Sequence, residues 1–216
     1  MKQINKYILG HLENPKFSIV ERLHINKDIG KHSYNYHPKT RDELEKLVDK
    51  LIKERGDNAD LNDIDTSEIT DMSHIFYYSK FNGDISEWDV SNVKKMETMF
   101  GCSKFTGENG DISKWDVSNV EDMYCMFYGS MFNRDISKWD VSNVKDMTCM
   151  FEKSKFKGDI SNWDVSKVED MHRMFQYSEF NGNISKWHVI NVKNMRDMFY
   201  DSPLEKNHPN WYKYYK

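Results

Sequence analysis

The sequence predicts an α/β repeat fold, in which each unit of about 24 residues contributes one short strand and one short helix to a solenoid. Three observations predict it. Tryptophan recurs at Trp88, Trp115, Trp139, Trp163 and Trp187, with spacings of 27, 24, 24 and 24 residues. The same apolar positions recur around each tryptophan, and an amphipathic segment precedes the array. A fixed period of this length is typical of solenoids, because one such unit cannot bury its own apolar face.

Residues 1–60 precede the array and form an N-terminal cap or arm. Thr40 and Glu43 have the spacing of a capping box, apolar residues follow at 44, 47, 48, 51 and 52, and Gly56 is placed to end the helix. We therefore expect a helix at about 40–55 that covers the open end of the array. The segment before it is ambiguous: Ile4, Ile8 and Leu12 fit a short helix, residues 17–25 could form a strand or a helix, and residues 27–39 resemble a loop. It is either a packed cap or a separate arm that contacts a partner.

Each unit then has the same expected elements. The stretch FNGDIS supplies turn residues and a short strand centred on Ile85, and Trp88 follows at a corner. Val93, Met96, Met99 and Phe100 lie at i, i+3, i+6 and i+7, the spacing of one helix face. The serine two positions before the valine (Ser91, Ser118, Ser142, Ser166) is the expected helix cap. These features predict a helix of about two turns in every unit.

The array spans residues 61–216, with about five full repeats and partial units at both ends; Ile64 and Trp211 occupy the tryptophan position of the partial units. Helices need 8–10 Å of spacing whereas strands need about 4.8 Å, so we expect an arc with the strands on its concave side. Lys94, Glu121, Lys145, Glu169 and Lys193 alternate in sign from unit to unit. This alternation predicts that the units stack in register.

The repeated stretch FNGDISEWDVSNVKKMETMF, with its near-copies up to about Leu204, resembles the short repeat of the BspA-like leucine-rich-repeat proteins. The resemblance covers about two thirds of the chain and rests mainly on the WDVSNV core. It implies a leucine-rich-repeat-like, right-handed solenoid that binds proteins or mediates adhesion and has no enzymatic activity. Members of that family are often secreted or surface-anchored, and this sequence contains no visible export signal or anchor.

Composition narrows the possible partners and compartments. The net charge of −4 and the absence of a basic block argue against nucleic acid as the main partner. No apolar run approaches the roughly 20 residues needed to span a bilayer. Three cysteines with no disulfide framework favour a reducing compartment. We therefore expect a monomeric cytoplasmic protein, or a cell-surface protein if an export signal has been removed.

The acidic residues and cysteines are candidates for chemistry. Paired carboxylates such as Asp135 and Asp140 could act in a glycosidase, but they recur in every unit, which favours turn hydrogen bonds over catalysis. Stacked aspartates could alternatively collect Ca²⁺, although no calcium-loop motif is present. Cys125 and Cys149 share a column without enough further ligands for zinc, so we expect buried free thiols. We predict no enzymatic activity, no cofactor and no metal site.

Function is expected where the copies differ. The first candidate strip lies beside the tryptophans on the strand side: Asp84, Glu87, Asp111, Lys114, Asp135, Lys138, Asp159, Asn162 and Lys186. A second candidate set lies on the helix side: Tyr77, Tyr78, Tyr124, Tyr128, His172, Arg173, Tyr177, Arg196 and Tyr200. From the two sets, we predict that the strip together with Tyr124 and Tyr128 contacts a partner, with the strip ranked first.

The leading hypothesis is a non-enzymatic module that recognises another protein through the solenoid surface. The small size, negative charge and missing export signal also fit an inhibitor from a phage or mobile element that occludes a host defence enzyme. A cell-surface adhesin of the BspA-like type is the third possibility.

Overall fold

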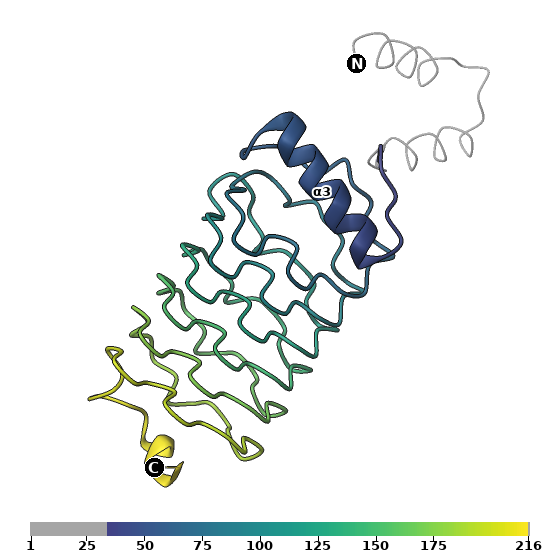
Figure 1. Ribbon diagram of the computed structural model, residues 1–216. Coiled ribbons are helices and arrows are strands. Elements are labelled where there is room, and N and C mark those ends of the chain that lie inside the picture. The colour runs from purple at the N-terminus through teal and green to yellow at the C-terminus, as the bar shows by residue number, and fades with distance from the viewer. Residues whose placement is uncertain (1–33, 216) are drawn as a thin grey trace, which may run out of the picture. The chain divides into compact units, whose positions relative to one another are not determined.

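The computed structural model describes residues 34–215, and the ambiguous segment before Tyr34 lies outside them. Residues from Asn35 onward form one compact unit. In it, successive coils of the chain lie side by side in a row, with helix α3 (Arg41–Arg55) at one end and the 3₁₀ helix η1 (Asn210–Tyr215) at the other (Figure 1). The predicted repeat solenoid is therefore present.

Helix α3 begins and ends where the sequence indicates. The backbone N–H of Glu43 donates to Thr40 Oγ1 at 3.3 Å, and the N–H of Gly56 donates to the carbonyl of Ile52. Leu44, Val48 and Leu51 are fully buried and belong to the same apolar core as the coils. This burial supports the prediction that α3 covers the end of the stack.

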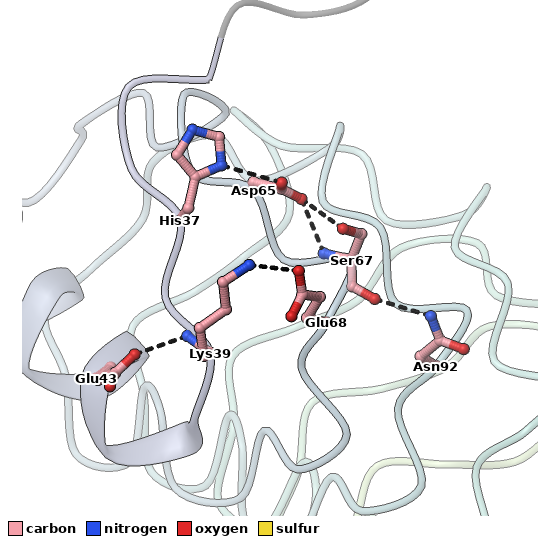
Figure 2. A network of polar contacts seen from close by, with 7 residues as sticks. All are labelled: His37, Lys39, Glu43, Asp65, Ser67, Glu68 and Asn92. Carbon is pink, nitrogen blue, oxygen red and sulfur yellow. Dashed lines mark hydrogen bonds and ion pairs between the residues drawn. The ribbon is translucent and has the colours of Figure 1, made fainter.

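A polar network joins the segment before α3 to the first coil (Figure 2). The His37 ring lies 3.1 Å from the Asp65 carboxylate, and Lys39 pairs with Glu68. The Lys39 N–H also donates to Glu43 at 2.7 Å, so Glu43 caps the residue before Thr40 instead of Thr40 itself. These contacts fix α3 to the first coil at its N-terminal end.

The predicted short helix in each coil is wrong. In residues 34–215, α3 and η1 are the only helices. In place of a helix, the segment after Val93 makes two reverse turns, in which the Met99 N–H donates to the Met96 carbonyl and the Ser103 N–H donates to the Phe100 carbonyl. The Gly101 N–H donates to the Thr98 carbonyl between them. The third residues of these turns, Thr98 and Cys102, have φ of 55° and 53°, as in type II turns. The serines expected to cap helices therefore cap none.

The same segment carries the hydrogen bonds between coils. The N–H groups of Met96, Thr98 and Phe100 donate to carbonyls of the next coil at 2.7–2.9 Å. Isolated parallel bridges run through this column, joining Asp71, Lys95, Asp122, Asp146, Asp170 and Asn194 in turn. At the strand position predicted around Ile85, the described residues form a single bridge, between Asp60 and Asp84, and no continuous series. Without a helix column, the predicted curvature loses its physical cause, because all sides can adopt strand-like spacing.

Aromatic rings fill the interior in continuous stacks. One stack contains Phe76, Phe100, Phe127, Phe151, Phe175 and Phe199, with neighbouring ring centroids 5.5–6.0 Å apart. A second contains Phe81, Phe105, Phe132, Phe156 and Phe180, at 6.1–6.4 Å. The predicted apolar columns of valine, methionine and tryptophan are also buried. All coils therefore share one continuous apolar core.

The tryptophans tie each coil to the preceding one. The indole N–H of Trp139 donates to the Ile112 carbonyl at 3.0 Å, and Trp88, Trp163, Trp187 and Trp211 make the equivalent bond 27 residues back. Trp211 thereby confirms its place in the repeat. Trp115 differs: its indole N–H is buried and has no partner within residues 34–215. Three extra residues lie between Trp88 and Trp115, so the residue 27 positions before Trp115 is not equivalent to the acceptors of the other tryptophans.

This difference gives a paired prediction. Trp139→Phe removes a hydrogen bond to the Ile112 carbonyl, which still accepts the Trp115 backbone N–H, whereas Trp115→Phe removes a buried donor that has no partner within residues 34–215. Both substitutions lose the same ring volume. We expect Trp139→Phe to lower the free energy of unfolding by about 1–2 kcal/mol more than Trp115→Phe. Chemical denaturation of both variants tests this. Equal losses of unfolding free energy would contradict a stabilising role of the hydrogen bonds from the indole groups to the preceding coil.

Candidate functional site

The strip beside the tryptophans is solvent-accessible, but its aspartates serve the backbone. The carboxylates of Asp84, Asp111, Asp135 and Asp159 each accept the N–H of the serine two residues later at 2.9 Å. These bonds confirm the predicted turn role. They lower the pKa of Asp135 and Asp159 because they favour the ionised carboxylate. The varying residues Glu87, Lys114, Lys138, Asn162 and Lys186 are exposed.

The alternating column of lysine and glutamate confirms the register. Lys145 Nζ lies 2.6 Å from Glu121 and Lys193 Nζ lies 2.5 Å from Glu169, each pair 24 residues apart. Shallow depressions border this column. Asparagines form a second column beside it: the side-chain N–H₂ groups of Asn92, Asn119, Asn143 and Asn191 donate to serine carbonyls of the preceding coil at 2.7–2.8 Å.

A column of carboxylates lies on the other side of the lysines and glutamates. Burial raises the pKa of Asp146, and the carboxylates of Asp122 and Asp170 raise it further, although the Thr148 N–H opposes the shift. Burial also raises the pKa of Asp122, with Glu97 adding to the effect. The last member of the column is Asn194, whose side-chain N–H₂ donates to Asp170 at 3.0 Å. Asn194 therefore ends the column of carboxylates with a neutral side chain that does not repel Asp170.

Asp146→Asn should stabilise the fold. The folded state raises the pKa of Asp146, so the folded state binds more protons and ionisation at neutral pH costs stability. The substitution removes that cost and keeps the acceptor for the Thr148 N–H. We expect a gain of about 0.5 kcal/mol at pH 7, allowing for solvent screening of this half-buried group. The gain should shrink as the pH falls towards 4, because the wild-type carboxyl becomes protonated.

Asp135→Asn is the matched control, since its folded-state pKa is lowered. It should give no gain at pH 7. Urea denaturation between pH 4 and pH 7 measures both variants, and a gain for Asp146→Asn that grew at low pH would contradict this assignment.

The second reverse turn of each coil carries most of the exposed aromatic surface. We call the side chains of Tyr77, Tyr78, Tyr128, Met131, Tyr177 and Tyr200 the tyrosine face. They lie between the buried phenylalanine that opens this turn and the next buried phenylalanine, except that Tyr200 lies between Phe199 and Leu204. Tyr78, Tyr177 and Tyr200 are 68%, 44% and 50% exposed. The rings of Tyr177 and Tyr200 meet edge to face at 5.5 Å, so this part of the face is continuous across coils.

Lys153 organises the centre of the tyrosine face. Its ammonium group lies 5.3 Å from the Tyr128 ring centre and 5.8 Å from that of Tyr177, and it donates to the Tyr128 hydroxyl at 3.1 Å. That bond raises the pKa of Lys153. A hydrogen bond with Cys102 raises the pKa of Tyr78 to about 12. Lys153 also lies 3.8 Å from the carboxylate of the buried Glu152, which partly compensates its charge.

The structure separates the predicted contact residues into two sets. Tyr128 belongs to the tyrosine face, whereas Tyr124 lies in the first turn, where its N–H donates to Asp122. The charged residues of the strip follow different turns, near the tryptophans. The sequence alone did not indicate the contacts of Lys153. The equivalent positions of the other coils hold different residues, so no repeating pattern marks this lysine.

The cysteines are free thiols as predicted. Cys125 and Cys149 are buried in adjacent coils, and Cys102 is partly exposed. Within the described part of the chain, no cluster of three histidine, cysteine or acidic side chains is placed to hold a metal ion. Over the same residues, no helix is both long and apolar enough to cross a bilayer.

Comparison with known proteins gives a family. The sequence matches the family described as "Mycoplasma protein of unknown function, DUF285" over residues 43–155 and again over residues 104–212. No curated protein and no solved structure matches the chain. The two overlapping matches span the coils and most of α3, well over half of the sequence. The chain belongs to the DUF285 repeat family.

Proposed function

We propose that this chain is a non-enzymatic module that binds a partner protein through its tyrosine face. One observation supports this proposal most directly. Tyr128, Lys153, Tyr177 and Tyr200 form one contiguous group on a backbone that is fixed by hydrogen bonds between coils. Tyrosine and cationic side chains are frequent anchors of protein interfaces. Tyrosine offers a large contact area at low entropic cost, because it has few rotatable bonds.

The strip beside the tryptophans is the less favoured surface. Its aspartates already accept backbone hydrogen bonds, and its remaining residues are mostly lysines. Long flexible lysines contribute little when they stay exposed at the rim of an interface. A BspA-like adhesin and an inhibitor of a host enzyme are two versions of this proposal, and they differ only in the partner that is bound.

Comparative capture tests the surface. Wild-type protein, a Tyr177→Ala/Tyr200→Ala variant and a Lys114→Ala/Lys138→Ala variant would be used to capture proteins from a lysate of the source cells. We expect one protein to be captured by the wild type and the lysine variant and to be lost from the tyrosine variant. Melting temperatures of the three proteins should agree within a few degrees, because all four side chains are exposed.

The opposite result, loss of capture with the lysine variant alone, would move the binding site to the strip. Retention of the captured protein by both variants would contradict the proposal that either surface is needed.

A further inference from the structure

A depression on another side of the coils contains a lysine without a close carboxylate partner among the described residues. It has a volume of about 360 Å³ and is lined by Lys145, Lys167, Glu169, Asn191 and Lys193. Three lysines and one glutamate give it a formal charge of +2. Lys145 and Lys193 pair with Glu121 and Glu169, but the closest partner of Lys167 is the neutral carboxamide of Asn143, at 2.6 Å. Within the described residues, no carboxylate lies within 4 Å of Lys167, although Asp164 acts on it from further away.

Lys167 also interrupts the column of asparagine side chains that form hydrogen bonds between coils. The equivalent positions in other coils hold Asn92, Asn119, Asn143 and Asn191, and each donates to a serine carbonyl of the preceding coil. At Lys167 this bond is missing, so among residues 34–215 no side chain donates to the Ser142 carbonyl. One coil therefore gives up an inter-coil hydrogen bond and gains a positive charge. Such a loss of a stabilising contact is expected where a residue serves binding.

The depression continues along the array. A second depression, lined by Lys94, Asn119, Glu121, Asn143, Lys145 and Lys167, shares Lys145 and Lys167 with the first. The carboxamide oxygens of Asn119 and Asn191 accept no hydrogen bond from the described residues. The groove thus offers lysine donors for carboxylates and amide acceptors for backbone N–H groups. A peptide supplies both chemistries, whereas inorganic phosphate has carboxylate-like charge but no N–H donors.

Acidic residues lie beyond the lysine and glutamate column, and Asp164 also interacts electrostatically with Lys167. Asp146 and Asp170 lie beyond the lysine and glutamate column, where their carboxylates accept the N–H groups of Thr148 and His172 at 2.7 Å. They would repel an acidic ligand placed on their side. An acidic ligand is therefore expected on the asparagine side, within hydrogen-bonding reach of the Lys167 ammonium group, where its carboxylate would compete with the more distant Asp164.

We propose that the groove around Lys167 binds an extended acidic peptide segment of a partner protein, with Lys167 as the main contact for a carboxylate. This site is separate from the tyrosine face, and it does not depend on the function proposed for that face.

Lys167→Asn gives a sharp test because asparagine is the residue that the other coils carry there. The variant should fold and should regain the bond to the Ser142 carbonyl, which predicts a melting temperature about 2 °C higher. It should also lose the positive charge at this position. Lys114→Asn is the matched control, with the same charge change on the strip beside the tryptophans.

Fluorescence anisotropy with a labelled hexaglutamate peptide would measure binding at low salt, with hexaglutamine and inorganic phosphate as comparison ligands. We expect the wild type and Lys114→Asn to bind hexaglutamate equally, and Lys167→Asn to bind it roughly tenfold more weakly. Binding should weaken as salt is raised, because the charges are exposed.

Three results would overturn the proposal. Equal weakening by both substitutions would indicate a nonspecific charge effect. No weakening by Lys167→Asn would exclude Lys167 as the contact. Displacement of hexaglutamate by phosphate at a comparable concentration would identify a general anion site instead of a peptide site.

Discussion

Phe127→Ala is expected to lower the free energy of unfolding by about 4 kcal/mol. Phe127 is fully buried, and its ring stacks on Phe100 at 5.6 Å and on Phe151 at 5.7 Å. Truncation of a fully buried phenylalanine removes its apolar contacts and leaves a cavity, at a typical cost of 3–5 kcal/mol. The loss falls in the middle of the array, so it weakens the coupling between the two halves.

Tyr128→Ala is the control for this prediction. It removes a ring of similar size from the next residue, but Tyr128 is partly exposed. We expect it to cost less than half as much as Phe127→Ala. Urea denaturation followed by tryptophan fluorescence and by circular dichroism would measure both, and two separated transitions are expected for Phe127→Ala if the halves uncouple. A cost for Phe127→Ala no larger than that of Tyr128→Ala would contradict a continuous phenylalanine core.

Val48→Asp should detach helix α3 from the end of the stack. Val48 is fully buried in the apolar core, so an aspartate there would be a buried charge without a partner. We expect a loss of at least about 3 kcal/mol. Leu61 and Ile64 of the first coil belong to the same buried cluster as Val48, so this end of the core would become exposed. An uncapped solenoid end associates with other exposed ends, so the variant should form oligomers.

Lys46→Asp places the same residue on the exposed side of the same helix. It should remain as stable as the wild type within about 0.5 kcal/mol. Light scattering coupled to gel filtration would compare the two variants over a range of concentrations. A monomeric and stable Val48→Asp protein would show that α3 is not needed as a cap.

Much of the fold could be predicted because its determinants repeat. The tryptophan period, the buried columns, the charge alternation and the boundaries of α3 all follow from residue types at fixed spacing. The turn role of the aspartates could be predicted for the same reason, since a residue that recurs in every coil serves the coil. These features depend on local chemistry and on the stacking of identical neighbours.

The reverse turns could not be distinguished from a helix by periodicity. A turn closed by a hydrogen bond from i+3 to i places Met96 and Met99 three residues apart, which is also a helical spacing. The usual signal for a type II turn is glycine or asparagine at its third residue. Here that position holds Thr98 in one coil and Cys125 in another, both with positive φ, and hydrogen bonds to the neighbouring coil hold them there.

The candidate surface was only partly predictable. The tyrosines could be named from the sequence, but their contact across coils depends on which turn carries them. Lys153 and Lys167 each occur once at their position, so no repeat pattern marks them. Their importance appears only from their neighbours, two tyrosine rings for Lys153 and an interrupted asparagine column for Lys167.

Backbone hydrogen bonds join the coils through a segment whose apolar residues have helical spacing. Scalar couplings across hydrogen bonds, measured by NMR on deuterated, isotope-labelled protein, identify each donor and acceptor directly. We expect a coupling between the amide nitrogen of Phe127 and the carbonyl carbon of Met150, in the next coil, where the hydrogen bond is 2.9 Å long. A coupling from the same amide to the carbonyl of Met123, four residues earlier, would indicate an α-helix and would contradict the account.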